Sequence, residues 1–251
     1  RMEELQQISD RITVMRDGLY VDTVNTKETT LDKIISMMVG RTIYEAPREE
    51  NKNKTSEVIL EVKNLNRGKM VRDVSFKLHK GEILGFAGLM GAGRTETARV
   101  IFGADKLEGG EIYINGEAIE IKTPKDAVEA GIGYLSEDRK RYGLTLGETI
   151  EENIALTSVE RFTNVLGFTN MKTISKIADD YIKLLDIRTP SSKQKVQNLS
   201  GGNQQKVVIA KWLLRDCDIL IFDEPTRGID VGAKSEIYKL LTQLSEQGKS
   251  I

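Results

Sequence analysis

The sequence predicts an α/β fold with a mostly parallel sheet, and three observations carry this prediction. Strand-like apolar segments alternate with helical ones over residues 58–251, which is the pattern of a parallel sheet with crossover helices. Ile219–Phe222 is a continuous apolar run rich in β-branched residues, as expected of a central parallel strand. Another apolar segment, Ile83–Ala87, leads directly into a glycine-rich loop and then a helix.

The composition is that of an ordinary globular protein, with 39% hydrophobic and 30% charged residues. The 37 basic and 38 acidic residues nearly cancel, and no block of like charge is present, so we expect no nucleic-acid partner. A single cysteine, Cys217, excludes an intramolecular disulfide and fits a reducing compartment. No apolar run approaches the roughly 20 residues that span a bilayer, and there is no signal peptide. Work at a membrane would therefore need a separate spanning partner. Because the chain begins at Arg1, we expect it to be a piece of a longer protein.

The first 57 residues predict a small unit and a linker. The expected elements are a helix at Met2–Ile8, strands at Ile12–Met15 and Leu19–Val24 around a turn at residues 16–18, and a helix at Leu31–Met38 that Thr30 caps and Gly40 ends. Residues 44–57 hold almost nothing apolar after Tyr44 and carry mixed charge. Such a segment buries too little surface to offset its ordering entropy, so we predict a linker.

The remaining residues, 58–251, predict the larger unit. The expected strands are Val58–Val62, Val71–Leu78, Glu82–Ala87, Glu111–Ile114, Ile132–Leu135 and Ile219–Phe222. The expected helices are Gly93–Phe102, Lys125–Ala130 after Pro124, Ile174–Leu185, a helix that Ser200 caps and that ends at Leu214, and Gly232–Leu244. Residues 140–200 should be mainly helix and loop.

The glycine loop, residues 88–95, follows an apolar strand-like segment and precedes a helix, which is the context of a phosphate-binding loop. Its glycines let main-chain N–H groups converge on an anion, and the helix N-terminus adds its dipole. Thr95 stands where a hydroxyl would bind Mg²⁺. A glycine-rich turn without a ligand remains an alternative. The candidate phosphate-binding residues are Gly88, Gly91, Ala92, Gly93, Arg94 and Thr95.

The signature segment, residues 199–206, reads LSGGNQQK and is a more specific signal. A serine followed by two glycines at a helix start gives a capped N-terminus with open amides, which is a second place for an anion. An ordinary N-cap on an amphipathic helix is the alternative. The candidate residues are Leu199, Ser200, Gly201, Gly202 and Asn203.

Two carboxylates follow the apolar run Ile219–Phe222. Asp223, at the tip of a buried parallel strand, would hold Mg²⁺ beside the glycine loop. Glu224 would orient or deprotonate the attacking water. A solvated acidic turn after a strand is the alternative. Three motifs follow one another in the sequence: a glycine loop, LSGG, and an apolar strand that ends in Asp-Glu. This order argues against a chance occurrence of the motifs.

On these motifs, residues 58–251 resemble an ATP-binding-cassette ATPase domain. LSGGNQQ with DEPTRGIDVGAK is especially similar to the second domain of the tandem ATPases of ribose-, galactoside-, xylose- and arabinose-type importers. The resemblance implies a P-loop NTPase fold with a mostly parallel core sheet, an antiparallel β subdomain and a helical subdomain at about residues 140–200. It implies ATP and Mg²⁺ as ligands, bound between the glycine loop of one domain and the signature segment of another.

The same resemblance implies the role of several other parts. Asp230 would belong to the loop that crosses the interface between the two domains. Residues 1–43 would be the tail of the preceding nucleotide-binding domain, and residues 58–251 would stop before their own switch histidine. His79, the only histidine, is interpreted as a strand-end surface residue. The implied partners are membrane-spanning sugar permease subunits, the first nucleotide-binding domain and, indirectly, a periplasmic or extracellular sugar-binding protein. The implied location is peripheral, on the cytoplasmic side of the membrane.

The sequence also departs from the family pattern. Arg94 replaces the usual lysine, and a planar guanidinium is not equivalent to a compact ammonium at a tight site. Glu137 stands where most members have a glutamine that senses Mg²⁺ and the membrane partner, although residues 137–140 could equally be a solvated turn. No aromatic residue occurs from Val62 to Val74 to stack on adenine. We therefore expect a weakly hydrolysing site here and a signature segment that completes the competent site of the missing domain.

Two other functions remain as alternatives. One is a regulatory nucleotide-binding half with little or no hydrolysis of its own, which Arg94 favours. The other is a soluble cassette protein of DNA repair or translation. A repair protein would carry a long coiled coil between Gly93 and Leu199, where no sustained heptads occur, and a translation protein would have a more basic linker.

Overall fold

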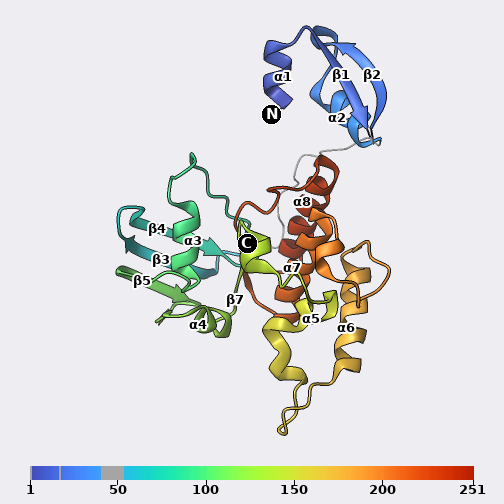
Figure 1. Cartoon of the computed structure of the whole chain (residues 1–251). Helices are drawn as coiled ribbons and strands as arrows, with labels where there is room; N and C mark the ends of the chain where they lie inside the picture. The colour runs from blue at the N-terminus through green and yellow to red at the C-terminus, as the bar shows by residue number, and fades with distance from the viewer. Residues whose placement is uncertain (1, 17, 41–53) are drawn as a thin grey trace. The chain divides into compact units, whose positions relative to one another are not determined.

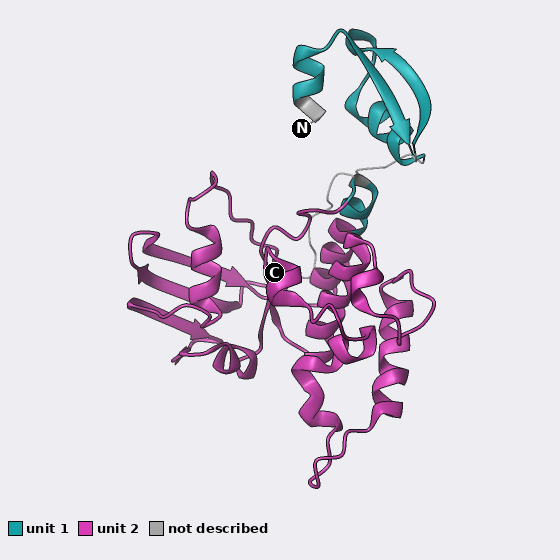
Figure 2. Ribbon diagram, viewed as in Figure 1, with its two compact units in different colours: residues 1–49, 230–236 teal, residues 50–229, 237–251 magenta. Residues whose placement is uncertain are grey.

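The structure, a computed structural model, describes residues 2–16, 18–40 and 54–251. The chain divides into two compact units (Figure 2). The first unit holds residues 1–49 and 230–236, and the second holds residues 50–229 and 237–251. The predicted turn residue Asp17 and the predicted linker residues 44–53 lie outside the described residues.

The first unit contains a β-hairpin that packs against a helix. Its elements are α1 (Met2–Ile8), β1 (Arg11–Arg16), β2 (Leu19–Asn25), a 3₁₀ helix (Thr26–Glu28) and α2 (Leu31–Val39) (Figure 1). The strands are antiparallel, and the alternate residues Ile12 and Val14 pack with Ile34 of α2 in a small apolar core. The Thr30 hydroxyl accepts a main-chain amide of α2 at 3.3 Å, and Gly40 ends the helix with a φ of 76°. The predicted hairpin, cap and helix are confirmed.

The second unit contains most of the regular structure. Its elements are β3 (Val58–Arg67), β4 (Val71–His79), α3 (Arg94–Ile101), β5 (Gly109–Ile114), β6 (Glu117–Ile119), α4 (Pro124–Glu129), β7 (Ile132–Leu135), a π-helix (Arg139–Gly143), α5 (Ile150–Ala155), a 3₁₀ helix (Leu156–Phe162), α6 (Met171–Leu184), a 3₁₀ helix (Val196–Asn198), α7 (Gly201–Arg215) and β8 (Ile219–Phe222). The last helix, α8 (Val231–Glu246), starts among the residues of the first unit and ends among those of the second. Every helix among the described residues is too short or too polar to span a bilayer.

The strands of the second unit form an antiparallel sheet and a parallel pair. The antiparallel sheet has the order β4-β3-β5-β6, and its last strand was not predicted from the sequence. The parallel pair is β7 with β8, in a register that places Leu135 opposite Phe222. Ser250 continues this pair on the far side of β8, because its amide donates to the Asp218 carbonyl and its carbonyl accepts the Leu220 amide, both at 2.9 Å. The carboxyl ends of β7 and β8 therefore lie side by side at one edge.

Helix α7 packs across the parallel pair and forms the centre of the core. In Figure 1 the four-stranded sheet lies at one end of the second unit, α5 and α6 lie at the other, and α7 lies between them. The contact is close at Gly133, where an added Cβ would lie 3.0 Å from Leu220 and 3.1 Å from the Trp212 ring. Ile209, Ile219 and their neighbours are almost completely buried here. A glycine in the middle of β7 is thus explained by the ring that lies on it.

The helical stretch at residues 140–200 agrees with expectation in its main helices. Thr149 and Asn170 cap α5 and α6 through their side-chain oxygens, and Thr149 forms a full capping box with Glu152. Asn153 is 1% exposed, and its amide group makes three hydrogen bonds of 2.8–3.0 Å to the main chain of Thr145 and Thr149. The region is therefore held by polar contacts within its first turns as well as by its apolar face.

Candidate functional site

The glycine loop joins an extended segment to the first turn of α3. Gly91 and Gly93 have φ angles of 78° and 88°, a region that glycine enters without steric cost. No atom lies within 4 Å of a Cβ built on Gly91, whereas one built on Gly93 would collide with the Met70 main-chain oxygen. The Gly93 carbonyl accepts from the Thr97 amide at 2.9 Å and hydroxyl at 2.8 Å. The loop is thus a tight turn, open to solvent at Gly91, beside the N–H groups of a helix start.

The base of the loop is equally tight. A Cβ on Gly88 would lie 2.9 Å from the Cβ of Ala92, and the Ala92 amide donates to the Leu89 carbonyl at 3.1 Å. Leu89 and Met90 project outward with 86% and 99% of their surface exposed. The predicted positions 88, 91, 92 and 93 therefore form one closed turn with its apolar side chains directed into solvent.

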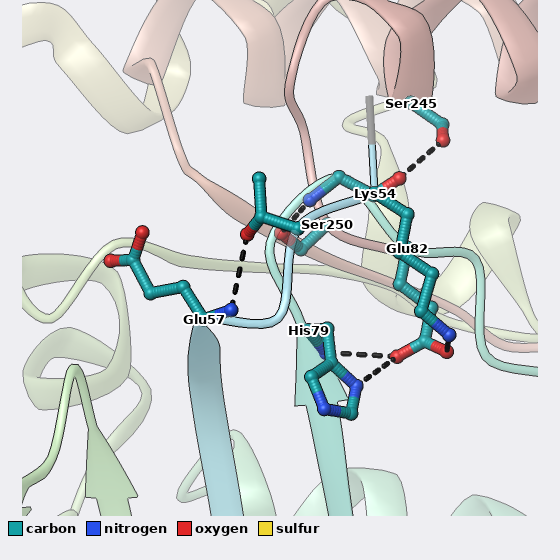
Figure 3. Close-up of polar contacts among 8 residues, drawn as sticks. Lys54, Glu57, His79, Glu82, Ser245 and Ser250 are labelled. Atoms are coloured by element: carbon teal, nitrogen blue, oxygen red, sulfur yellow. Dashed lines mark hydrogen bonds and ion pairs between the residues drawn. The ribbon is translucent and has the colours of Figure 1, made fainter. Parts of the chain in front are cut away.

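A polar cluster fixes the chain just before the loop (Figure 3). Glu82 accepts from Lys54 Nζ at 2.6 Å and from the His79 amide at 2.8 Å, and His79 Nδ1 lies 3.0 Å from the same carboxylate. Burial alone would raise the pKa of Glu82, but these hydrogen bonds outweigh it and hold the pKa at about 2. His79 is the last residue of β4, with 31% of its side chain exposed, in agreement with its interpretation as a strand-end residue.

The predicted strand Glu82–Ala87 is wrong, because this segment is not a β-strand. Its start is fixed at Gly81, whose amide donates to Ser250 Oγ at 3.0 Å and whose carbonyl accepts from Ser245 Oγ at 2.7 Å (Figure 3). Ile251 then exchanges one hydrogen bond with Glu82 and one with Leu84, at 2.8 and 2.7 Å. Beyond these bonds, a cavity of about 310 Å³ with a mostly apolar lining separates residues 83–86 from β8. Apolar composition predicts extended backbone, but a strand also needs a neighbour along its length.

Asp223 lies at the carboxyl end of β8 and contacts the first turn of α3. Its two carboxylate oxygens accept separately from Thr95 Oγ1 at 3.2 Å and from the Tyr134 hydroxyl at 3.0 Å. Only 8% of the residue is exposed, and its amide donates to the Leu135 carbonyl at 2.9 Å. The glycine loop and the strand tip are therefore adjacent, as the motif order predicts.

Tyr134 is a site residue that the sequence reasoning missed. It lies on β7 opposite Ile221 of β8, so its ring stands beside the strand that carries Asp223. Burial and the neighbouring carboxylate raise the pKa of Tyr134 well above its usual value, so its hydroxyl remains a donor at ordinary pH. The available signal was a polar aromatic within a short buried strand, because a buried tyrosine hydroxyl usually has a partner.

Arg94 and Glu224 form an ion pair across the site. Arg94 Nη1 lies 3.1 Å from Glu224 Oε1, with 34% and 45% of the two side chains exposed. Glu224 has a φ of 46° and its carbonyl accepts the Arg227 amide at 3.0 Å, so the carboxylate stands on a strained turn. The residue that replaces the expected lysine is thus engaged with the predicted water-activating carboxylate.

The signature segment begins α7 as predicted. Ser200 is the N-cap, and its hydroxyl accepts from the Asn203 amide at 3.5 Å and from Asn203 Nδ2 at 3.0 Å. Asn203 Oδ1 in turn accepts the Arg188 amide at 2.9 Å. Gly202 is buried, and Leu199 precedes the cap with 9% of its surface exposed. The segment is thus a fixed helix start rather than a mobile loop.

Glu137 and the acidic loop, residues 223–228, are joined by an ion pair. The Glu137 carboxylate pairs with the guanidinium of Arg227, a partner that the sequence reasoning missed. Arg139, also missed, donates from Nη1 to the Arg227 carbonyl at 2.9 Å. The structure therefore brings Glu137 to the loop after Asp223 through a basic side chain.

Asp230 belongs to the first unit, at the start of α8. Its Oδ1 accepts the Ala233 amide at 2.8 Å and its carbonyl accepts the Lys234 amide at 3.0 Å, so it caps the start of α8. The structure thus assembles the glycine loop with Asp223 and Glu224, and Glu137 with the far end of the acidic loop. Together these residues can surround an anion and a cation and place one carboxylate nearby.

Comparison with known proteins identifies the family of the chain. The family model described as ABC transporter matches residues 71–227, more than half of the chain. The putative ribose/galactose/methyl galactoside import ATP-binding protein 2 of Burkholderia cenocepacia (strain HI2424) is 59% identical over 251 residues, which are 100% of this chain and 49% of that protein. The ribose import ATP-binding protein RbsA of Clostridium tetani (strain Massachusetts / E88) is 51% identical over 100% of this chain and 50% of that protein. The chain thus spans about half the length of the curated relatives it matches.

Solved structures show the same fold. The cbiO1 protein of Clostridium perfringens, part of the ABC transporter complex cbiONQ, superposes with a TM-score of 0.62 and 23% identity, over 77% of this chain and 76% of that one. The ATP-binding cassette MJ0796, in a dimeric post-hydrolysis state bound to ADP and Pi, gives 0.61 and 25%, over 76% and 85%. With a P-loop NTPase fold, a glycine loop beside an Asp-Glu strand tip and this family match, the chain belongs to the ABC transporter family.

Proposed function

We propose that residues 58–251 bind ATP with Mg²⁺ and, within a longer ATPase subunit, hydrolyse it to energise import of a monosaccharide such as ribose. The observation that carries the proposal is the 3.2 Å contact between Thr95 and Asp223, which sets a hydroxyl and a carboxylate beside the open glycine loop. The names of the relatives, which are sugar import ATP-binding proteins, support the same function.

The residues present suit Mg²⁺. Thr95 and Asp223 offer a hydroxyl and a carboxylate oxygen, the ligand type that Mg²⁺ prefers, and it commonly takes one or two protein ligands with phosphate oxygens and water. No group of three or more histidine, cysteine or acidic residues able to hold a metal occurs among the described residues. When bound, the ion would neutralise charge on the phosphates.

The chain's own residues would act in a simple order. N–H groups around Gly91 and Gly93 hold the triphosphate, and the guanidinium of Arg94 is attracted to it. Tyr134 keeps Asp223 oriented toward Thr95 by its hydrogen bond of 3.0 Å. Glu224, once it separates from Arg94, can accept a proton from the attacking water.

The ion pair between Arg94 and Glu224 supports a difference in hydrolysis rate between this site and the corresponding site of the preceding domain. With Arg94 held 3.1 Å from Glu224, the nucleotide and the carboxylate compete for one cation, which favours slow hydrolysis at this glycine loop. The signature segment, which includes Ser200, Gly201 and Asn203, would complete a faster site on the preceding domain. In the whole subunit we expect Ser200→Arg to reduce turnover far more than Arg94→Ala. Equal losses would contradict the difference.

The proposed assembly rests on the resemblance of the motifs and on a chain that spans about half the length of its relatives. Residues 1–43 would be the tail of the first nucleotide-binding domain, residues 44–57 the linker, and residues 58–251 most of the second domain, with about 140–200 as its helical part. Asp230 and Glu137 would face the domain interface and the permease. The partners would be the first domain, membrane-spanning permease subunits and, indirectly, a sugar-binding protein, with the ATPase on the cytoplasmic side of the membrane.

The alternative of a purely regulatory half is not favoured. Relatives that contain this half are named as import ATP-binding proteins, and Glu224 is retained at the strand tip. The family of sugar importers also explains the absence of a coiled-coil insertion better than a repair protein would.

Titration of the 251-residue chain with a fluorescent ATP analogue, with and without Mg²⁺, tests the proposal. We expect binding that Mg²⁺ tightens, and a loss of about tenfold in the Mg²⁺-dependent affinity of Asp223→Ala, equivalent to ~1.4 kcal/mol. Asp179→Ala removes an exposed carboxylate on α6 and serves as the matched control. Unchanged affinity of Asp223→Ala, with Mg²⁺ still tightening its binding, would refute the site.

A further inference from the structure

Arg139 lies where three segments of the second unit meet. Its Nη1 donates to the Arg227 carbonyl at 2.9 Å and its Nη2 to the Gly228 carbonyl at 3.4 Å, both in the acidic loop. Its Nε donates to Gln204 Oε1 of the signature segment at 3.4 Å. The residue itself opens the π-helix that follows β7 and Glu137. One side chain therefore connects the end of β7, the start of α7 and the loop after β8.

The contacts match the shape of a guanidinium. Its two terminal nitrogens donate to the successive carbonyls of Arg227 and Gly228, while Nε donates to the Gln204 side chain. A lysine ammonium on its flexible stem cannot span three acceptors in this fixed geometry. This position therefore needs the planar guanidinium of arginine, with its several N–H donors, and not only a positive charge.

The first glycine of the signature segment is explained by this junction. A Cβ on Gly201 would lie 2.7 Å from Arg139 Nη2 and 2.8 Å from the Gly228 carbonyl oxygen. Both values are shorter than real Cβ contacts, and Ile229 lies only 3.3 Å away, so little space remains for adjustment. The start of α7 therefore packs directly on the pair that Arg139 makes with the acidic loop.

Neighbouring residues fix Arg139 and its partners. Asp138 Oδ1 accepts the Lys140 and Arg141 amides at 3.2 Å each, which holds the first turn of the π-helix. Gln204 Nε2 donates to the buried Val196 carbonyl at 3.2 Å, so the amide presents its oxygen to the guanidinium. The junction is thus supported on both sides.

The junction bears on the turn that carries Glu224. That residue has a φ of 46°, and its carbonyl accepts the Arg227 amide at 3.0 Å. Arg139 donates to the carbonyl of the same Arg227. Any shift of the start of α7 relative to Arg139 is therefore passed to the turn on which Glu224 stands.

We propose that Arg139 is a positioning residue that couples the signature segment to the acidic loop, so that the state of one sets the placement of Glu224 in the other. This proposal rests on the function proposed above, because that function makes Glu224 the proton acceptor for the attacking water. Arg139 acts through Glu224 and Gly201 and does not itself touch the nucleotide.

Amide hydrogen exchange on the 251-residue chain tests the coupling without any need for ATP turnover. In Arg139→Ala we expect faster exchange by about tenfold or more at residues 201–205 and at residues 224–229 together, because a hydrogen-bonded charged group is lost from both. Amides of β3, β4 and β5 should keep their protection. Arg139→Lys retains the charge and should show most of the same increase.

Arg141→Ala is the matched control. Arg141 lies two residues further along the same π-helix, with its guanidinium 5.1 Å from the Tyr142 ring. Its removal deletes the same charge and should leave both segments unchanged. In the longer subunit, Arg139→Ala should lower kcat about tenfold, because the displaced signature segment completes the faster site, while KM for ATP changes by less than about twofold.

The outcomes separate the two proposals. Faster exchange in only one of the two segments, or the same effect in Arg141→Ala, would overturn the coupling. An unfolded Arg139→Ala leaves Arg139→Lys to decide, and wild-type exchange rates in that variant would also overturn it. A coupled increase in a chain that fails to bind the ATP analogue would support the junction and reject the nucleotide function.

Discussion

Removal of the Tyr134 hydroxyl measures how firmly Asp223 is held. The hydroxyl donates to Asp223 Oδ2 at 3.0 Å, and the carboxylate is on a residue with only 8% exposure. A hydrogen bond to a charged group is worth about 1.5–3 kcal/mol, and the Thr95 hydroxyl still serves the other oxygen, so we expect Tyr134→Phe to lower the free energy of unfolding by ~2 kcal/mol. At about 2–4 °C per kcal/mol for a chain of this size, Tm should fall by roughly 4–8 °C.

Urea denaturation followed by tryptophan fluorescence is a suitable assay. The protein has one tryptophan, Trp212, which packs on Gly133 of β7 and therefore reports on the second unit. Tyr142→Phe is the control, since that ring is 57% exposed and its variant should change the free energy of unfolding by less than ~0.5 kcal/mol. Equal effects of the two variants would refute the reasoning, because the contact with Asp223 would then contribute nothing.

Three further predictions concern the glycine loop, a half-buried carboxylate and a buried lysine. Gly93→Ala should lower the free energy of unfolding by ~2–4 kcal/mol, because a positive φ and a collision with the Met70 carbonyl both act there. Gly167→Ala is the control, because Gly167 has a positive φ but open space around it, and it should cost only ~1–2 kcal/mol. Equal losses for the two variants in urea denaturation would contradict this reasoning. The pKa of Glu82 is about 2 in the folded protein against an ordinary 4.5, so the unfolded state binds more protons in this window and stability should fall as pH drops from 4.5 to 2. Glu82→Gln should flatten that fall, as measured by the free energy of unfolding against pH, and an unchanged slope would count against the pKa. Burial lowers the pKa of Lys211 from 10.5 to about 8, so stability should rise as pH increases between these values, and Lys211→Met should abolish this rise in the same measurement.

Local sequence signals predicted much of the site because its chemistry depends on short motifs. The open turn at Gly91 and Gly93, the cap at Ser200 and the adjacency of Thr95 to Asp223 all follow from residue type and motif order. Most helices were also predictable, since apolar spacing and caps are local properties. The strand tip at Asp223 needed only the rule that parallel strands share one carboxyl edge.

Contacts between distant segments could not be predicted in the same way. Glu82–Ala87 has the composition of a strand, but its pairing depends on residues near 251 and so failed as a strand prediction. Tyr134 donates to Asp223, 89 positions away, and Arg139 donates to the carbonyl of Arg227, 88 positions away. The residues next to Tyr134 and Arg139 in the sequence do not indicate these partners. The ion pair of Arg94 with Glu224 was also not predicted. The two motifs were expected to lie close together, but Arg94 was assigned to the phosphates and Glu224 to the attacking water.

On the proposed function, the pairing of Arg94 with Glu224 would make nucleotide binding an exchange of anions on a single guanidinium. A triphosphate that takes over Arg94 would leave the Glu224 carboxylate without its counter-ion. Glu224 would then be free to accept a proton from water only after the nucleotide has bound. In the structure, Glu224 is paired with Arg94, so the proton acceptor and its counter-ion come from the same chain.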